Sequence, residues 1–226
     1  MTEYTRQPAN IQFGHYFPQL IFRGNFPGTE QLNIDILNFV LGKETDGTLG
    51  NANTKLHKGT IGGWQPTWPD NGILDQDEPC IKFLKEDIIM PSINIYAQES
   101  TKLTFSQFTG QNHNPPTGVE LHINSWSVLY RKGNFQCPHL HRDSAFTGIY
   151  YPAVPENLIE PEGAIVFHNS AVESSWYGYD QTKIITPKAG DLIIFPSWVT
   201  HQAYPFSGDG HRLSIVFDVF VTGINE

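Results

Sequence analysis

The segment GDLIIFPSWVTHQAYPFSGDGHRLSIVFDVFV, residues 190–221, decides the fold class. Its two ends, 190–195 and 211–221, are rich in branched and aromatic residues and read as β-strands, while the Pro, Ser, Gly and Asp between them favour turns. Similar runs precede this segment at intervals of roughly ten to twenty residues. They cover residues 121–130, 146–151, 163–168 and 183–186. Strands recurring at this spacing between turn signals predict a β-sandwich or β-barrel.

The N-terminal half predicts one helix beside short strands. Residues 29–43 carry apolar side chains at helical spacing after Thr29, a residue type common at helix N-termini. Residues 15–26 read as a short strand, and residues 42–87, rich in Gly, Asn, Asp and Pro, read as irregular structure with short strands. We therefore expect one mainly β domain over residues 1–226. Strands, helix and loops of 1–120 would pack on a core formed by 121–221.

Composition excludes some classes of partner. The formal charge is −9 with 14 Lys and Arg and no basic cluster, whereas nucleic-acid binding depends on clustered cations, so no nucleic-acid partner is expected. No window approaches the roughly 20 apolar residues of a membrane span, and no signal peptide is recognisable, so no membrane partner is expected. The 2 Cys residues, Cys80 and Cys137, are expected as free thiols in a reducing compartment. These features predict a cytoplasmic location, the host cytoplasm if the protein is viral.

A candidate metal motif lies in CPHLHRDSAFTGIYY, residues 137–151. His139, His141 and Asp143 stand at alternate positions, so in an extended strand their side chains would project from the same face. Imidazole and carboxylate ligands together suit a ferrous ion, and three such ligands leave coordination positions open for substrate and oxygen. One His-x-His or His-x-Asp is by itself a weak signal, and a further ligand must come from elsewhere in the chain.

A second group of polar residues lies in the opening segment. His201 follows one apolar strand, and Arg212 begins the next with Ser214 on its own face. An unpaired guanidinium in such a strand would be costly, so Arg212 needs an anion. The anion is either one of the 23 Asp and Glu residues or a bound carboxylate ligand, which a planar guanidinium grips by paired hydrogen bonds.

Together the motifs HLHR, TGIYY, FPSWVTH and RLS resemble those of the non-haem Fe(II) and 2-oxoglutarate-dependent oxygenases. The resemblance is closest to a bacterial and phage group that carries His-x-His-Pro, Ser-Gly-Val-Tyr-Tyr, Phe-Pro-Ser-Trp and Arg-x-Ser. YFPQLIF and GTIGGWQPTW are similar to that group as well, so the resemblance covers most of the chain. It implies a double-stranded β-helix (jelly-roll) fold with one or a few helices near the N-terminus.

The resemblance also implies an activity and its cofactors. The protein would be a dioxygenase, specifically a hydroxylase, that uses Fe(II), 2-oxoglutarate as cosubstrate and molecular oxygen. It would couple oxidative decarboxylation of 2-oxoglutarate to oxidation of a small-molecule or peptide substrate. His201 matches the distal metal ligand, and Arg212, assisted by Ser214, matches the group that binds the far carboxylate of 2-oxoglutarate. Tyr151 falls where prolyl-hydroxylase-like relatives place a tyrosine that donates to that carboxylate, and Tyr130 is a weaker candidate.

The proximal metal ligands stay open at this point. His141-Arg142-Asp143 is a literal His-x-Asp, and a carboxylate would balance the ferrous charge. The resembled group instead keeps the double histidine, with Pro where Arg142 stands and no fixed acid at position 143, which favours His139. Two other classes remain as alternatives, namely a cupin-like metal enzyme that does not use 2-oxoglutarate and a non-catalytic jelly-roll binding module. The cupin-like enzyme would have no need for Arg212 and Ser214, and in the binding module the histidines would be incidental.

Overall fold

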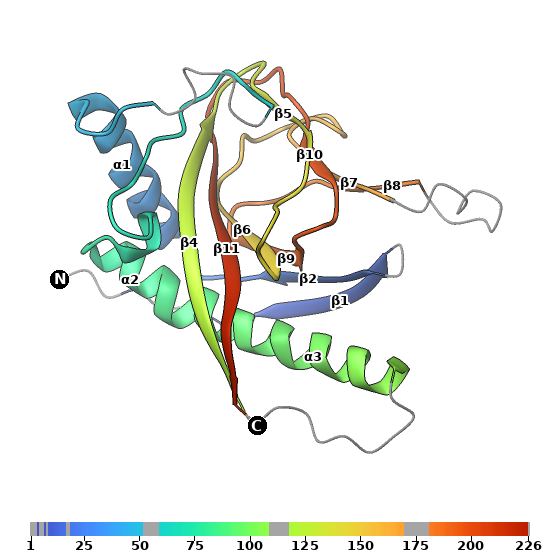
Figure 1. Cartoon of the computed structure of the whole chain (residues 1–226). Coiled ribbons are helices and arrows are strands. Elements are labelled where there is room, and N and C mark those ends of the chain that lie inside the picture. Colours follow the sequence, from blue (N-terminus) through green and yellow to red (C-terminus); the bar gives the residue numbers. More distant parts are fainter. Residues whose placement is uncertain are drawn as a thin grey trace.

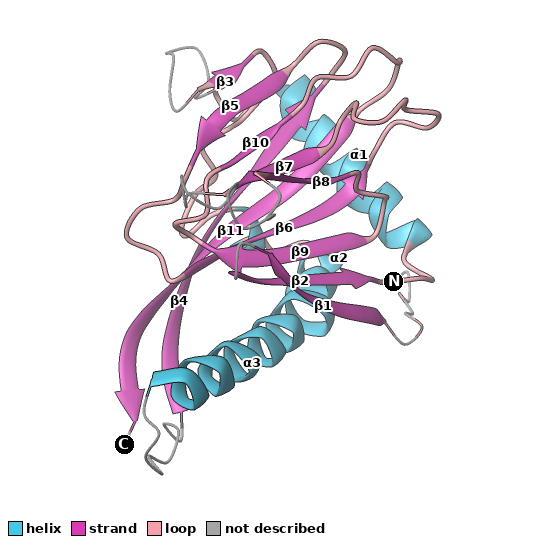
Figure 2. Ribbon diagram, turned by 90° about the vertical axis from the view of Figure 1, so that its right-hand side faces the viewer, coloured by secondary structure: helices cyan, strands magenta, loops and turns pink. Residues whose placement is uncertain are grey.

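The structure is a computed structural model, which describes residues 4, 7, 9–16, 19–51, 59–108, 118–169 and 181–225. In these residues two antiparallel sheets face each other, which confirms the mainly β prediction (Figures 1 and 2). The six-stranded sheet has the order β1-β2-β9-β6-β11-β4, and the five-stranded sheet has the order β3-β5-β10-β7-β8. The strands of the larger sheet, in that order, are Asn10–Tyr16, Gln19–Asn25, Asp191–Pro196, Phe146–Ala153, Arg212–Asn225 and Gly118–Tyr130. Those of the smaller sheet are Thr60–Ile61, Phe135–His139, His201–Ala203, Ile165–His168 and Thr182–Ile185.

Helices cover the outer face of the larger sheet (Figure 1). Helix α1, Glu30–Asp46, is the helix that the sequence predicts, and Gly47 ends it in the left-handed conformation (φ 67°). Thr29 precedes it, but its hydroxyl donates to the Phe26 carbonyl and does not cap the helix. A short 3₁₀ turn, η2 (Ile73–Asp75), follows in the chain, and then a second helical region. That region comprises α2 (Pro79–Phe83), the π-helical turn η3 (Leu84–Ile89) and α3 (Met90–Phe108).

The prediction of irregular structure was wrong for residues 79–87. That prediction rested on the Gly, Asn, Asp and Pro content of residues 42–87, but Pro79 stands in the first turn of α2, where proline is favoured. Pro91 stands in the first turn of α3, and the π-helical turn η3 directly precedes that helix. Most of the apolar residues of 79–89 are buried beside the larger sheet, and this packing stabilises the helical form. They include Ile81, Leu84, Ile88 and Ile89.

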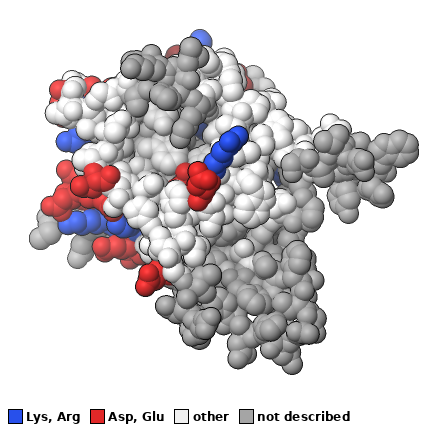
Figure 3. Space-filling model, viewed as in Figure 1, with Lys and Arg blue, Asp and Glu red and all other residues white. Residues whose placement is uncertain are grey.

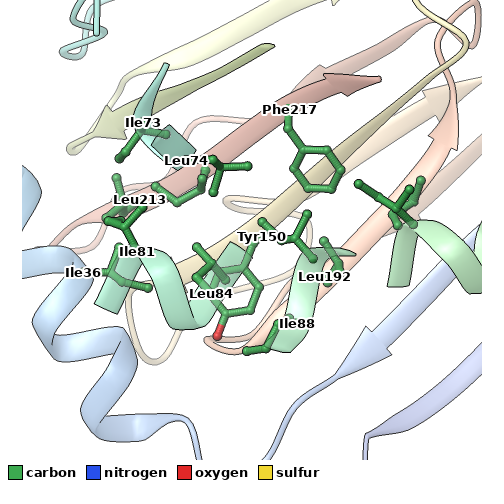
Figure 4. Close-up of a cluster of buried hydrophobic side chains, with 14 of the residues drawn as sticks. Ile36, Ile73, Leu74, Ile81, Leu84, Ile88, Tyr150, Leu192, Leu213 and Phe217 are labelled. Carbon is green, nitrogen blue, oxygen red and sulfur yellow. The ribbon is translucent and has the colours of Figure 1, made fainter. Parts of the chain in front are cut away.

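Alternate residues of the larger sheet face two different cores. On the helix side, Leu213 and Phe217 of β11, Leu192 of β9 and Tyr150 of β6 pack against the helical segments (Figure 4). The Tyr150 hydroxyl reaches α1 and donates to Asn33 Oδ1 at 2.7 Å. Because strand residues alternate between faces, this arrangement turns the residues between them toward the smaller sheet.

The second core lies between the two sheets and borders the site described below. Tyr151, next to Tyr150 on β6, is fully buried there, together with Val216 of β11. Phe167 of β7 and Ala203 of β10 come from the smaller sheet. Arg212, Ser214 and Asp218 lie an even number of positions from Val216 along β11. Their side chains therefore project from the same face of the sheet as that of Val216.

Gly148 of β6 packs closely against Phe217 of β11, next to the residues that face the second core. Gly148 lies opposite Phe217, and a Cβ atom on Gly148 would come within 2.0 Å of the Phe217 ring. Glycine is therefore required here for the ring to approach the strand this closely. The next pair in the same register is Thr147 opposite Asp218, so this packing also sets the position of those two polar side chains.

Trp64 and Trp68 are buried in the helix-side core, where Trp68 stacks on Phe39 at 5.5 Å, so both act as packing anchors. Cys80 and Cys137 are free thiols, as expected. No helix among the described residues has the length and apolar character to cross a membrane. On the face shown in Figure 3, the described Lys and Arg residues are few and form no continuous patch.

Candidate metal centre

Three histidines converge between the two sheets. His139 ends β5 and His201 begins β10, and these two residues pair directly across the antiparallel ladder. His141 follows β5, and its backbone N–H donates to the Ser197 carbonyl at 2.9 Å, which ties it to the turn before His201. One nitrogen from each ring lies within 4.8 Å of the other two, a spacing that could hold a metal ion. The ring centroids are 4.3 to 5.2 Å apart.

Hydrogen bonds fix the tautomer of each ring. Nδ1 of His139 lies 3.0 Å from the Cys137 carbonyl, and Nδ1 of His201 lies 3.0 Å from the Val199 carbonyl. A carbonyl oxygen only accepts, so Nδ1 must carry the proton in both rings. Nδ1 of His141 contacts the Asp218 carboxylate at 2.7 Å. In the neutral imidazoles this leaves Nε2 of all three without a proton, as a metal ligand requires.

The arrangement of the three imidazole rings is more favourable with a bound cation than without one. Nε2 of His139 and Nε2 of His141 are 3.3 Å apart, although neither neutral tautomer has a proton to share between them. Burial lowers the pKa of His201 well below its usual value, and the neighbouring His139 and His141 lower it further. His201, only 3% exposed, is therefore a neutral ring that presents a lone pair to the same space. A divalent ion there would replace lone-pair repulsion by three coordinate bonds.

Asp143 is not part of this group. It is exposed, and its backbone φ of 73° places it in a turn after His141 rather than in a continuing strand. The alternation on which a His-x-Asp pair depends holds only along an extended strand, and the chain leaves that conformation at this point. Of the two proximal sets that the sequence left open, the structure brings together His139 and His141.

Sequence reasoning missed three further residues at the site. Asp218 of β11 contacts His141, Thr147 of β6 contacts Asp218, and the Trp126 ring of β4 stacks on His141 at 5.6 Å. The signal for Asp218 is present in IVFDVF, where one acid interrupts an apolar strand on the face that carries Arg212 and Ser214. Thr147 and Trp126 have no such signal, because their roles depend on strand register.

Arg212 lies deep between the sheets without a carboxylate partner among the described residues. It is 3% exposed, its Nε donates to the Gly163 carbonyl at 3.0 Å, and one terminal nitrogen donates to Ser214 Oγ at 3.2 Å. Both of these hydrogen bonds go to neutral oxygens. The buried guanidinium charge therefore has no compensating Asp or Glu within the part of the chain that the structure describes.

Two tyrosines flank this guanidinium. Its central carbon lies 5.0 Å from the Tyr151 ring centroid and 5.8 Å from that of Tyr130. Burial raises the pKa of each tyrosine to about 12, so both hydroxyls keep their protons at neutral pH. The Tyr130 hydroxyl donates to Gln136 Oε1 at 3.2 Å. The Tyr151 hydroxyl is completely buried and has no hydrogen-bond partner in the described ranges. An orphaned donor beside an unneutralised cation matches the requirements of a bound carboxylate.

A known protein family matches the part of the chain that carries these residues. A family model described as "Putative 2OG-Fe(II) oxygenase", where 2OG denotes 2-oxoglutarate, matches residues 124–218. The matched segment contains the three histidines, Tyr151, Arg212 and Asp218, and it lies within the predicted core of 121–221. No curated protein matches the sequence.

Two solved structures share the fold over most of both chains. A prolyl-4-hydroxylase from Pseudomonas putida has a TM-score of 0.56 and 18% identity, covering 95% of this chain and 94% of its own. A prolyl hydroxylase from Trichoplax adhaerens, in complex with a peptide fragment of hypoxia-inducible factor, has a TM-score of 0.50 and 17% identity, covering 84% and 79%. They confirm the jelly-roll oxygenase fold. Residues 124–218 belong to the 2OG-Fe(II) oxygenase family, and the protein is an Fe(II)- and 2-oxoglutarate-dependent oxygenase, an oxidoreductase that acts with molecular oxygen on a substrate.

Proposed function

We propose that the protein is a hydroxylase whose Fe(II) is held by His139, His141 and His201. The observation that carries this ligand set is the convergence of one ring nitrogen from each histidine, in rings that are each held through Nδ1. Three protein ligands leave open positions on a six-coordinate ion, which is the arrangement that Fe(II) oxygenases need. Asp143 has no part in this set.

We further propose that Arg212 binds the far carboxylate of 2-oxoglutarate. Its buried charge has only neutral acceptors, Gly163 O and Ser214 Oγ, among the described residues. Tyr151 would add its unpaired hydroxyl to the same carboxylate. Tyr130 would help less directly, because its hydroxyl already donates to Gln136 and its ring lies against the guanidinium. These contacts would fix the cosubstrate at one end while its keto-acid end faces the histidines.

The cofactors and the protein chain make different contributions to the reaction. Bound Fe(II) and 2-oxoglutarate supply the oxidising chemistry that activates oxygen. The chain supplies a fixed ligand set, a carboxylate clamp and a site largely closed to water, since Arg212, His201 and Tyr151 are all buried. Excluding water protects a reactive site from side reactions and strengthens the charge interactions that hold the cosubstrate.

Anaerobic titration tests this function directly. We expect a visible absorption band when both Fe(II) and 2-oxoglutarate are added to the protein, and neither component alone should produce it. The band reports the cosubstrate bound to the metal, so it requires both halves of the proposed site. The His201→Ala variant should show no band. A wild-type protein that binds Fe(II) but gives no band with 2-oxoglutarate would contradict the proposed cosubstrate site.

The prime substrate, a small molecule or a peptide, would approach over an apolar rim formed by Leu140 and Trp198. Leu140 lies between His139 and His141 and is 40% exposed, and Trp198 lies in the turn before His201 and is 57% exposed. The hydrogen bond between His141 N and Ser197 O brings these two segments together. Exposed apolar groups beside a polar centre are common at ligand sites.

Succinate production measures the contribution of this rim. A substrate should stimulate succinate formation above the background that iron and 2-oxoglutarate give alone. For Trp198→Ala we expect the background rate to stay and the stimulation to fall by about tenfold or more, a loss equivalent to a buried aromatic contact of about 1.5 kcal/mol. Equal stimulation in the variant and the wild type would exclude Trp198 from substrate binding.

A further inference from the structure

Asp218 is a half-buried acid in an otherwise apolar stretch of β11. Its Oδ1 accepts two hydrogen bonds, one from His141 Nδ1 at 2.7 Å and one from Thr147 Oγ1 at 2.6 Å. Strand pairing places Thr147 directly opposite Asp218, so the second bond follows from the register of β6 and β11. Both hydrogen bonds meet at Oδ1, so the buried hydroxyl and the imidazole together fix the position of that oxygen.

The contact differs from those of the other two histidines. Nδ1 of His139 and Nδ1 of His201 donate to neutral backbone carbonyls, whereas Nδ1 of His141 donates to a carboxylate. A hydrogen bond to an ionised acceptor is about twice as strong as one to a neutral group. It also makes the opposite nitrogen of the ring a stronger electron donor. His141 is further held by the Trp126 ring, which lies nearly parallel to it at an interplanar angle of 19°.

Asp218 does not reach the metal position itself. It contacts Nδ1, and the nitrogen that faces His139 is Nε2, on the other side of the ring. Three neutral imidazoles supply no negative charge to a divalent ion. The Asp218 carboxylate is hydrogen-bonded to the far side of the His141 ring.

We propose that Asp218 is a positioning residue that acts on the metal through His141. It holds the Nδ1–H tautomer, aims Nε2 at the ion and supplies the negative charge that the three histidines lack. Thr147 assists by holding the carboxylate. This inference rests on the proposed three-histidine site. In that site the Asp218 carboxylate is hydrogen-bonded to a metal ligand and is not itself a metal ligand.

The test uses the full chain with Asp218→Asn, which keeps the size of the side chain and removes its charge. Two readouts are independent of turnover. The first is the affinity for Co(II) alone, measured by competition with a chelator. The second is the Fe(III)/Fe(II) midpoint potential of the iron-loaded protein. We expect the Co(II) dissociation constant to rise about 10- to 100-fold, the usual cost of losing such a partner. We also expect the potential to rise, because the carboxylate stabilises the more highly charged ferric ion.

Three further variants isolate the contribution of the Asp218 charge. Thr147→Val should move both readouts in the same direction by less, since it frees the carboxylate without removing it. Asp191→Asn removes another buried acid of the same sheet, one that binds Arg23, Asn25 and the Lys188 N–H, and it should move neither readout. His201→Ala tests the metal site itself.

The outcomes are distinguishable. If Asp218→Asn keeps wild-type Co(II) affinity and potential while His201→Ala loses the metal, the positioning role is overturned and the metal site stands. If His201→Ala binds Co(II) as tightly as the wild type, the proposed metal site and the role of Asp218 fail together. If Asp191→Asn matches Asp218→Asn in both readouts, the effect reflects the loss of any buried acid, and the specific role is again overturned.

Discussion

Replacing His139 by alanine is expected to abolish stoichiometric iron binding, whereas Asp143→Ala is expected to leave it intact. The expectation follows from position. His139 contributes one of three nitrogens that lie within 4.8 Å of one another, while Asp143 is exposed in a turn outside the group. Loss of a hydrogen-bond partner behind a ligand already costs about 10- to 100-fold in metal affinity, so loss of the ligand itself should cost on the order of 100-fold or more.

The measurement is the iron content of protein reconstituted anaerobically with Fe(II) and then freed of unbound metal. 2-Oxoglutarate turnover by His139→Ala should fall together with its iron content. His122→Ala supplies the matched control, because His122 is an exposed histidine of β4 that bonds to Asn124, away from the three rings. His122→Ala should bind iron as the wild type does. Iron retained by His139→Ala and lost from Asp143→Ala would reverse the proposed ligand set.

The strands were predictable because their local signals agree with the tertiary structure. Runs such as 146–151 and 190–195 combine branched and aromatic residues with flanking turn residues, and β6 and β9 occupy nearly those positions. Helix α1 was predictable for the same reason, since its apolar residues recur at helical spacing. In these elements the pattern of burial and the local preference of the backbone point to the same structure.

The second helical region was not predictable, because its local signals conflict. Pro91 and the acidic Glu86 and Asp87 interrupt the apolar pattern of residues 79–108, and the π turn at 84–89 shifts the spacing of the apolar side chains. Burial of apolar side chains beside the larger sheet explains why residues 79–89 are helical. Tertiary contacts there override a local preference that no window of sequence reveals.

The site likewise contains residues that the sequence could identify and a choice that it could not make. His201 and Arg212 could be found because each is a polar residue placed unusually at the edge of an apolar strand. The choice between His139 and Asp143 could not be made from sequence, because both lie two residues from His141 and the strand rule favours them equally. It depends on where the chain stops being extended. The backbone of Asp143, at φ 73°, marks that point.

Replacing Arg212 by alanine should weaken 2-oxoglutarate binding strongly while leaving iron in place. Losing one partner of a buried, hydrogen-bonded charge pair typically costs about 2–5 kcal/mol, which corresponds to roughly thirtyfold to several thousandfold in affinity. The dissociation constant can be measured anaerobically from the absorption band that 2-oxoglutarate produces with bound Fe(II). Iron content in the same samples reports whether the metal site and the surrounding fold have survived the substitution.

Arg212→Lys distinguishes a general requirement for charge from the specific fork of a guanidinium. Lysine keeps the charge, but it cannot donate at once to Gly163 O, to Ser214 Oγ and, in pairs, to a carboxylate. Its affinity for 2-oxoglutarate should therefore lie between those of Arg212→Ala and the wild type. Lysine binding as tightly as arginine would show that charge alone suffices.

The two tyrosines refine the same experiment, because each can lose its hydroxyl without losing its ring. The Tyr151 hydroxyl is buried without a partner among the described residues, so Tyr151→Phe should cost about 1.5–3 kcal/mol of 2-oxoglutarate binding, the usual value of a hydrogen bond to a charged group. The Tyr130 hydroxyl already donates to Gln136, so Tyr130→Phe should cost less. If Arg212→Ala and Tyr151→Phe both bind 2-oxoglutarate with wild-type affinity, the far carboxylate lies elsewhere. The unpaired guanidinium and the orphaned hydroxyl would then need another anion.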